Sequence, residues 1–259
     1  MEPSTRWISH HALPISALLL MLALLVGDLI WRRAAAAAPT AIPRTGARGS
    51  IADIVIMLAL LAVFGALAAG LRAQAGLVPF DLQLASGLQH ALPLPVLRTI
   101  GWITYVGNPW WLSVASLAIA GWLASTRRWL SLALWSFTLA GMVLIDESLK
   151  ACFRRERPLN GHGYLVVPGW SFPSGHACGA IVFYGLLAWL LLPAVPSAGK
   201  RRLLVAAAVA VVTLTGLSRV LLQAHYLSDV LAGYAIGAAW LMICVGIQRR
   251  LPWRGMSLP

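Results

Sequence analysis

The chain has 259 residues, of which 59% are hydrophobic and only 11% are charged, and its formal net charge is +12. Soluble globular domains carry about 25% charged residues, so this chain has too few charges to cover a surface that faces water. The same apolar composition excludes intrinsic disorder, and 23 Gly and 3 Cys exclude collagen-like and disulfide-scaffold proteins. A polytopic membrane protein is the class that remains.

Seven apolar runs are long enough to cross a bilayer core, which takes about 20 residues of helix. They cover 13–31, 51–72, 99–125, 129–149, 176–193, 203–222 and 226–247. Asn108-Pro109 interrupts the third run, so we expect a kink there or a membrane entry near Trp110. The sequence predicts an all-α integral membrane protein with a six-helix core and one extra N-terminal transmembrane helix.

Residues 1–50 are predicted to form an N-terminal accessory transmembrane helix followed by an inner linker over 34–50. A cleaved signal peptide is the alternative, because Ala34 to Ala38 resemble a small-residue cleavage region. Arg32 and Arg33 lie before these alanines, where a stop-transfer signal belongs, and favour a retained helix. The six-helix domain is expected at 51–247, and a basic cytoplasmic tail at 248–259.

Residues 73–98 are less apolar than the runs on either side of them. Leu, Val and Phe alternate there with Gln, Asp, Ser and His, and Pro93 and Pro95 punctuate the segment. This pattern predicts one or two short amphipathic helices lying in the outer membrane interface.

The excess of basic residues fits nucleic acid, an anionic lipid surface, a phosphorylated substrate or topology signals. With the N-terminus outside and the C-terminus inside, 12 of the 20 Lys and Arg residues lie in short inner segments. Positively charged loops favour the cytoplasmic side, which predicts this orientation. We therefore expect a multi-pass membrane protein; the family resemblance described below implies the bacterial inner membrane and no nucleic-acid partner.

Three polar clusters interrupt the apolar chain, all on the predicted outer, periplasmic face. They are Lys150–Pro158 (KACFRRERP), Pro173–His176 (PSGH) and Ser218–Asp229 (SRVLLQAHYLSD). A charge at the bilayer centre costs about 2.5–3.5 kcal/mol, so polar clusters near spans are candidates for function. Topology and chemistry point independently to the same face.

Five residues of these clusters are suited to binding a tetrahedral oxyanion. Lys150, Arg157 and Arg219 supply fixed positive charges, and guanidinium groups can grip a phosphate with two parallel hydrogen bonds. Ser174 adds a hydroxyl donor. Gly175 has no Cβ, so backbone N–H groups at a helix start can approach the anion closely.

Two histidines and a carboxylate complete the predicted site. Asp229 lies four residues after His225, which on a helix places both on one face. A carboxylate bonded to one ring nitrogen fixes the tautomer and leaves the other free to attack. His176 has no such partner and suits a general acid. No metal and no cofactor are required, since Lys and Arg can neutralise the developing charge.

K-x6-RP, PSGH and SR-x5-H-x3-D, in this order, resemble the three-part motif of the type 2 phosphatidic acid phosphatase family. The resemblance covers about 51–247 and occupies every motif position. It implies a six-helix core and a phosphohistidine mechanism, with His225 as nucleophile, Asp229 as its orienter and His176 as proton donor. It also implies that Lys150, Arg157, Ser174, Gly175 and Arg219 hold the phosphate. The helix at 13–31 lies outside the usual six.

The resemblance implies a lipid phosphatase with a lipid phosphate as its substrate in the membrane. Bacterial members of similar size act on undecaprenyl pyrophosphate or phosphatidylglycerophosphate. Two alternatives stay open: a phosphotransferase that passes the phosphate to a second lipid, and a transporter or lipid-binding protein without chemistry. The His225/Asp229 pair disfavours the last, because anion binding needs no nucleophile.

The remaining charges and cysteines are interpreted as structural. Asp146 is expected to pair with Lys150, and Asp28 with Arg32, each at a spacing of four residues. A disulfide between Cys152 and Cys178 is conceivable on the outer face, but the place of Cys152 inside the first cluster disfavours it.

Overall fold

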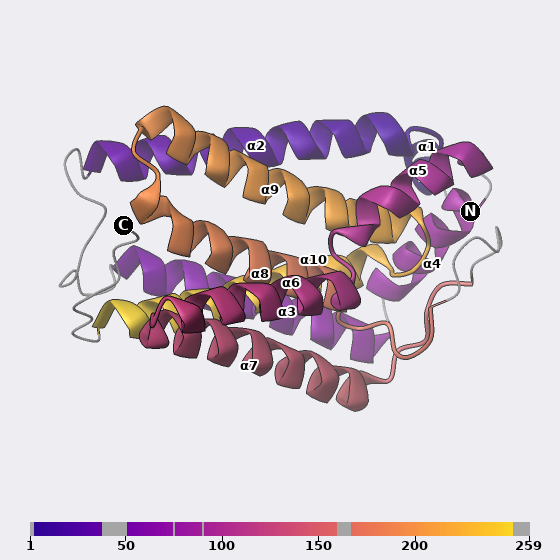
Figure 1. The fold of residues 1–259 in the computed structure, drawn as a ribbon. Coiled ribbons are helices and arrows are strands. Elements are labelled where there is room, and N and C mark those ends of the chain that lie inside the picture. Colours follow the sequence, from indigo (N-terminus) through magenta and orange to yellow (C-terminus); the bar gives the residue numbers. More distant parts are fainter. Residues whose placement is uncertain (1–2, 38–50, 75, 90, 160–166, 251–259) are drawn as a thin grey trace.

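The computed structural model describes residues 3–37, 51–74, 76–89, 91–159 and 167–250. All regular structure in these ranges is helical, which confirms the predicted all-α class (Figure 1). The elements are α1 (Pro3–His10), α2 (Ala12–Ala37), α3 (Ile51–Ala73), α4 (Leu77–Leu88), α5 (Leu94–Tyr105), α6 (Pro109–Ser125), α7 (Trp129–Phe153), α8 (Gly175–Leu191), η1 (Leu192–Ala194), α9 (Ala198–Leu221) and α10 (Leu227–Arg250).

Six of the described helices are long and apolar enough to cross a membrane: α2, α3, α7, α8 with η1, α9 and α10. They correspond to the predicted runs at 13–31, 51–72, 129–149, 176–193, 203–222 and 226–247. α6 has 17 residues, about 25 Å at 1.5 Å per residue. It packs beside α7 and α8.

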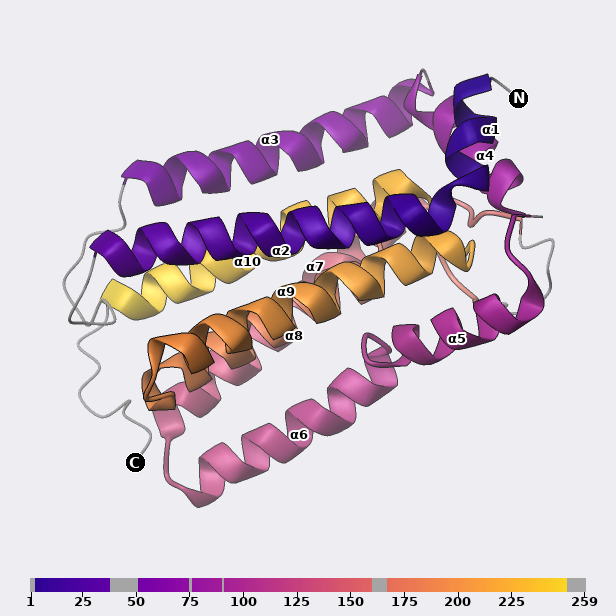
Figure 2. The ribbon, with the colours of Figure 1, turned by 90° about the horizontal axis from the view of Figure 1, so that it is seen from above.

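The third predicted run, 99–125, is wrong as a single helix. α5 ends at Tyr105, and α6 begins at Pro109 after a short turn (Figure 2). Asn108 caps α6, because its side-chain oxygen accepts a hydrogen bond of 2.9 Å from the backbone N–H of Trp110. Pro109 occupies the first helical position, where its missing N–H costs nothing. The interruption at Asn108-Pro109 is therefore confirmed, as a complete break.

The segment 73–98 forms the short helix α4 and the start of α5, as predicted. α4 packs against α1 and α3 rather than lying alone in the interface. Its Asp81 is only 1% exposed. α4 therefore places an acidic side chain in the protein interior, which the amphipathic pattern alone did not predict.

The centre of the bundle is the close contact between α8 and α10. A Cβ added to Gly233 would lie 2.8 Å from the backbone oxygen of Ser174, and one added to Gly237 would lie 2.5 Å from Ile181 Cγ2. These two glycines, four residues apart, let the helices approach closely, as small residues do in membrane helix pairs. The contact places the start of α8 against the start of α10.

α2 packs along α9, as both views show (Figures 1 and 2). Asp28 forms the predicted ion pair with Arg32, at 2.8 Å, and a second ion pair with Arg202 of α9. α2 continues to Ala37, so the first residues of the predicted linker, 34–37, are helical. Residues 38–50, and 251–259 of the predicted tail, lie outside the described residues.

The three polar clusters lie at one end of the bundle, at the right in Figure 1. There α7 ends, α8 begins, and the turn between α9 and α10 lies. The opposite end holds those basic residues predicted to face inward that the structure describes, among them Arg249, which is 3.5 Å from Asp53 of α3. The two groups of charge predicted from sequence are therefore separated by the length of the helices.

Candidate active site

His225 lies in the turn between α9 and α10 and is 3% exposed. The backbone N–H groups of Ala224 and His225 both donate to the carbonyl of Arg219, which ties the turn to the end of α9. The Nδ1 of His225 is 2.8 Å from the carbonyl oxygen of Ser171. Since that oxygen can only accept, Nδ1 carries the proton. Nε2 therefore presents a lone pair, and it accepts a 2.9 Å hydrogen bond from Arg157 Nη1.

Burial lowers the pKa of His225 from its ordinary 6.5 to about 4, and the nearby Asp229 only partly offsets this. Loss of water disfavours the charged imidazolium more than one carboxylate stabilises it. The imidazole is neutral at pH 7, which is the state that a nucleophile requires.

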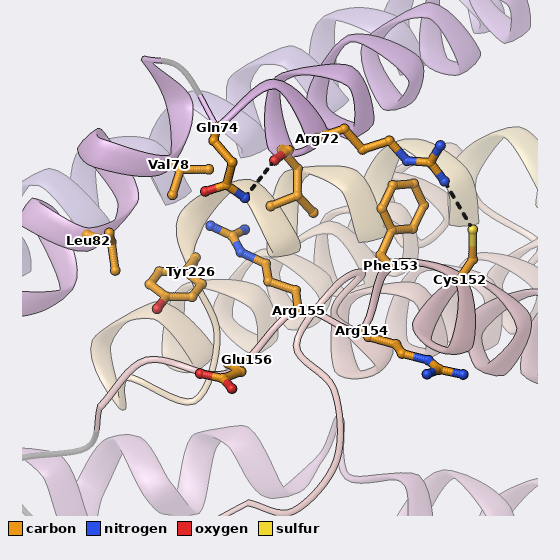
Figure 3. A pocket seen from close by; sticks show the side chains of 11 residues that line it. Arg72, Gln74, Val78, Leu82, Cys152, Phe153, Arg154, Arg155, Glu156 and Tyr226 are labelled. Atoms are coloured by element: carbon orange, nitrogen blue, oxygen red, sulfur yellow. Dashed lines mark hydrogen bonds between the residues drawn. The ribbon is translucent and has the colours of Figure 1, made fainter.

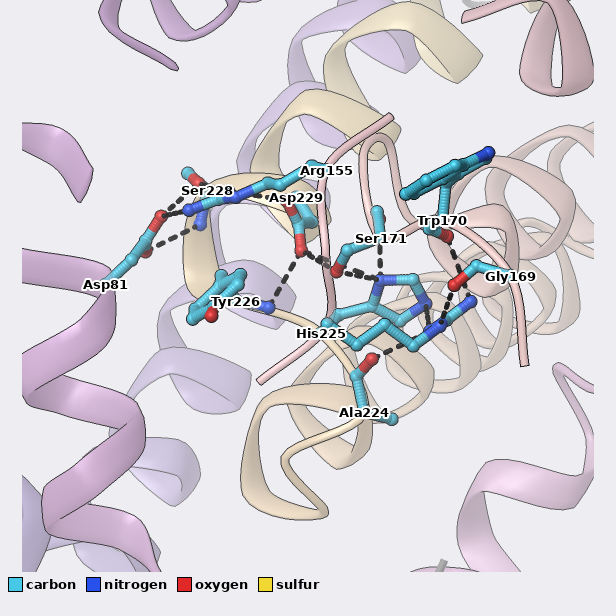
Figure 4. Close-up of polar contacts among 11 residues, drawn as sticks. Asp81, Arg155, Gly169, Trp170, Ser171, Ala224, His225, Tyr226, Ser228 and Asp229 are labelled. Carbon is cyan, nitrogen blue, oxygen red and sulfur yellow. Dashed lines mark hydrogen bonds and ion pairs between the residues drawn. The ribbon is translucent and has the colours of Figure 1, made fainter. Parts of the chain in front are cut away.

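Asp229 approaches His225 as predicted, but the two residues do not share one helical face. α10 begins at Leu227, so His225 lies before the helix, and its Nδ1 is 3.7 Å from Asp229 Oδ2. The carboxylate reaches the ring through Ser171, whose hydroxyl donates to Oδ2 at 2.5 Å and lies 3.3 Å from Nδ1 (Figure 4). The backbone N–H of Tyr226 donates to the same oxygen at 2.9 Å.

The other oxygen of Asp229 bonds to Arg155, a residue that sequence reasoning did not assign to the site. Arg155 Nη1 donates to Asp229 Oδ1 at 2.6 Å, and Nη2 donates to Asp81 Oδ2 at 2.8 Å. Ser228 joins the group, since its hydroxyl accepts from Arg155 at 2.7 Å and donates to Asp81. The ring of Tyr226 lies 4.1 Å from the guanidinium carbon. Figure 4 shows this chain of contacts from α4 to the turn.

Arg157 is held beside the nucleophile by main-chain oxygens. Its guanidinium donates to the carbonyls of Gly169, Ala224 and Trp170 at 3.0, 2.7 and 3.1 Å. Burial lowers the pKa of this guanidinium, opposed by Asp229 and Asp146, and an arginine remains charged at neutral pH. Its positive charge is therefore fixed at His225 Nε2.

Arg219 is 2% exposed and makes no ion pair with any carboxylate of the described residues. It donates to the hydroxyl of Thr104 at 3.3 Å, and its Nε has no hydrogen-bond partner. The hydroxyl of Ser174 is likewise buried without a partner, although this residue is the N-cap of α8. Buried donors normally find partners, so each of these two groups can bind an acceptor that the chain itself does not supply.

Lys150 is paired with two acids of its own helix. Its Nζ lies 2.6 Å from Asp146 Oδ2, which confirms the predicted pair, and 3.0 Å from Glu147 Oε1. A Cβ on Gly175 would lie 2.9 Å from Asp146 Oδ2 and 3.1 Å from Lys150 Nζ. A larger residue would displace the ends of these two side chains, and the first two clusters meet at this point.

His176 lies in the first turn of α8, where its ring is partly buried. It interacts electrostatically with Arg219, His225, Arg157 and Lys150. The backbone N–H of Ser174 donates to the carbonyl of Asp229 at 3.0 Å, which joins the second cluster to the third. All eight residues proposed from sequence therefore lie in one region, formed by the ends of α7, α8, α9 and α10.

A pocket of about 650 Å³ lies beside Arg155, between the ends of α3 and α7 and the start of α4 (Figure 3). Its walls include Arg72, Arg154, Glu156 and Tyr226 but none of the eight predicted residues. Cys152 also lines it and is free, as is Cys178, so the disulfide left open by the sequence is not formed.

Ser171, Arg155 and Asp81 are the site residues that sequence reasoning missed. Arg155 stood inside the first cluster but off its motif, Ser171 preceded PSGH, and Asp81 was the only acid in its apolar segment. The last of these signals, a charge in an apolar setting, was the one that could have drawn attention to α4.

Comparison with known proteins shows which proteins this chain resembles. The model of the PAP2 superfamily matches residues 129–253, which contain all three clusters. The chain is 30% identical to phosphatidylglycerophosphatase B of Bacillus subtilis (strain 168) over 109 residues, 42% of this chain and 53% of that protein. It is 34% identical over 79 residues to an uncharacterized 22.5 kDa protein in the cps region of Klebsiella pneumoniae, 30% of this chain and 37% of that protein. The chain thus matches about half or less of the length of these curated relatives.

The fold is similar to the crystal structure of the first transmembrane PAP2 type phosphatidylglycerolphosphate phosphatase from Bacillus subtilis. The TM-score is 0.61 at 22% identity, over 76% of this chain and 95% of that chain. Fold and site together define a multi-pass membrane protein with a buried cationic site at one end. Residues 129–253, just under half of the chain, are similar to the PAP2 superfamily.

Proposed function

We propose that the protein is a metal-independent lipid phosphatase of the bacterial inner membrane, with its active site on the periplasmic face and its catalytic domain at 51–247. The substrate is a lipid that bears a terminal phosphate, with undecaprenyl pyrophosphate and phosphatidylglycerophosphate as the leading candidates. The similarity to phosphatidylglycerophosphatase B supports the second of these.

The observation that carries the proposal is the buried Arg219. Its guanidinium has no carboxylate partner within the described ranges, and it interacts electrostatically with Arg157, another cation. The half-buried Arg157 and the buried Arg219 repel each other, and a buried charge without an ionic partner, as at Arg219, is costly. The cost is compensated when a phosphate dianion binds between them. The neutral Nε2 of His225 lies 2.9 Å from the second of these cations.

The proposed reaction has two steps. His225 Nε2 attacks the phosphorus, the bond to the lipid oxygen breaks, and His176 gives that oxygen a proton. His176 then takes a proton from water, whose oxygen attacks the phosphorus, and the phosphorus–nitrogen bond breaks. Phosphate leaves, and His225 returns to its neutral form. Arg157 and Arg219 stabilise the charge on the phosphoryl oxygens in both steps.

The test is phosphate release by the purified protein from undecaprenyl pyrophosphate, phosphatidylglycerophosphate, phosphatidate, lipid A and a soluble phosphate ester. We expect release from at least one lipid, its loss in His225→Ala and His176→Ala, and its retention in His10→Ala, an exposed histidine of α1. A labelled donor with a second lipid separates the alternatives: labelled phosphate means hydrolase, and labelled acceptor lipid means transferase. Absence of both products with every lipid, with binding unchanged in His225→Ala, would contradict the proposal.

A further inference from the structure

Arg155 lies between two helices that are far apart in the sequence. α7 ends at Phe153, and Arg154, with a φ of 45°, turns the chain. Arg155 then points between Asp81 of α4 and Asp229 of α10. The ion-pair distances are 2.8 and 2.6 Å. Arg155 is 8% exposed, Asp81 1% and Asp229 0%.

This contact divides the two oxygens of Asp229 between separate tasks. Oδ1 accepts from Arg155, whereas Oδ2 accepts from the Ser171 hydroxyl and the Tyr226 N–H. Because the planar guanidinium has fixed donor directions, it sets the rotation of the carboxylate. That rotation in turn places Oδ2 against Ser171, whose carbonyl receives the Nδ1 proton of His225.

Asp81 anchors the guanidinium from the other side. It also accepts from the hydroxyl and the backbone N–H of Ser228, the residue before Asp229. The main chain contributes too, since the carbonyl of Arg155 accepts the N–H of Ser171 at 2.8 Å. Arg155 itself makes no hydrogen bond to His225 among the described contacts, so its effect on the nucleophile passes through Asp229 and Ser171.

We infer that Arg155, anchored by Asp81, is a positioning residue that fixes Asp229 and Ser171 so that His225 holds its proton on Nδ1 and presents Nε2. Arg155 is therefore distinct from Arg157 and Arg219, which are proposed to bind phosphate. Its catalytic consequence rests on the proposed phosphatase activity, whereas its effect on the tautomer of His225 does not. α4 becomes a support of the active site rather than an interface helix alone.

The tautomer is the first measurement, because it is independent of activity. Nitrogen NMR of histidine-labelled protein should show His225 as the Nδ1–H form at neutral pH in the wild-type chain and in Arg154→Ala. The control replaces the neighbouring, exposed arginine, which makes only a local bond to Ala151. Arg155→Ala should show a mixture of the Nδ1–H and Nε2–H forms. An unchanged tautomer in Arg155→Ala would overturn the inference, whether or not the protein releases phosphate.

The second measurement is kinetic and uses inorganic phosphate as a probe of the binding site. Arg155→Ala should lower kcat by about 10²-fold, the scale of a misplaced catalytic group. KM and the inhibition constant of phosphate should stay within about twofold, because Arg157, Arg219 and Ser174 are untouched. Arg155→Lys, which keeps the charge but reaches only one carboxylate well, should lie between the two.

Asp81→Asn covers the case in which Arg155→Ala does not fold. It keeps the shape of the side chain and should reduce kcat with little change in phosphate inhibition. Equal loss of kcat, phosphate binding and thermal stability in Arg155→Lys and Asp81→Asn would overturn the inference, since it would indicate a purely structural role. Wild-type kcat in both variants would overturn it as well.

Discussion

His225 combines burial with reactivity, and the two are linked. Burial disfavours the charged imidazolium, so the pKa of His225 falls to about 4 and the imidazole is neutral at pH 7. The carbonyl of Ser171 then decides which nitrogen holds the proton. In the proposed mechanism, this buried histidine acts as the nucleophile while the carbonyl of Ser171 holds its Nδ1 proton.

This low pKa predicts an unusual pH profile. Lowering the pH protonates Nε2 and removes the nucleophile, so activity should persist down to about pH 5 and fall as the pH approaches the pKa. We expect the acid limb of kcat/KM near pH 4. The titration of the substrate phosphate, near pH 6, is measured separately from its phosphorus NMR spectrum. An enzyme limb at the ordinary value of 6.5 would contradict the prediction.

Arg219 predicts a conflict between stability and activity. Arg219→Met should reduce activity by about 10²–10³-fold, because a donor to the phosphoryl oxygens is lost. It should also raise the thermal midpoint, since an unpaired buried charge is replaced by an apolar side chain of similar length. Arg98→Met, on the exposed surface of α5, is the control. A variant that loses stability together with activity would argue against a role in phosphate binding.

The proposed chemistry also predicts the response to chelators. Lys150, Arg157 and Arg219 supply the positive charge near His225, so phosphate release should be the same with and without EDTA. The measurement is the rate before and after dialysis against chelator. Loss of activity that a divalent metal restores would refute the metal-free mechanism.

At the scale of elements, the close contact between α8 and α10 brings the second and third clusters together. The carbonyl of Ser174 leaves only 2.8 Å for a Cβ on Gly233, so the backbone that presents PSGH is in direct contact with α10. The two glycines were visible in the sequence, but their partners belong to another helix and are not encoded by local periodicity.

Gly233→Ala should therefore lower both stability and activity. Forcing a methyl group against a backbone oxygen costs about 1–3 kcal/mol in a packed interior. Gly246→Ala lies on the same helix and meets no atom within 4 Å; it should stabilise the helix by about 0.5–1 kcal/mol. Thermal unfolding in detergent and phosphate release measure both. Equal behaviour of the two variants would show that the close contact is not required.

Most transmembrane helices could be predicted from the sequence, because about 20 apolar residues have few other stable arrangements. The exceptions are informative. α5 and α6 read as one apolar run, since hydropathy does not register the turn that Asn108 caps. α4 was predicted as interfacial because a single acid, Asp81, does not reveal whether its partner is water or a buried arginine.

At the scale of the whole molecule, charge is separated along the bundle. The basic residues near the polar clusters lie at one end, and those predicted to face the cytoplasm lie at the other. In a membrane, this separation sets the orientation that we propose.

Cysteine labelling tests this orientation. Cys152 is exposed at the cluster end, whereas Cys178 and Cys244 are buried. A membrane-impermeant maleimide should label intact cells through Cys152 and should not label Cys152→Ser. Ser197→Cys in that background places a thiol at the opposite end, before α9, and should react only after the cells are opened. The reverse pattern would contradict the proposed orientation.

The sequence by itself determined the membrane class, the apolar helices and the identity of the three clusters. Composition and motif spacing are properties of the chain that do not depend on its neighbours. The tertiary structure alone decided that Ser171 lies between Asp229 and His225, and that Arg155 joins α4 to the site. These contacts form between residues as many as 74 positions apart, and only the packing of helices brings such side chains within hydrogen-bond distance.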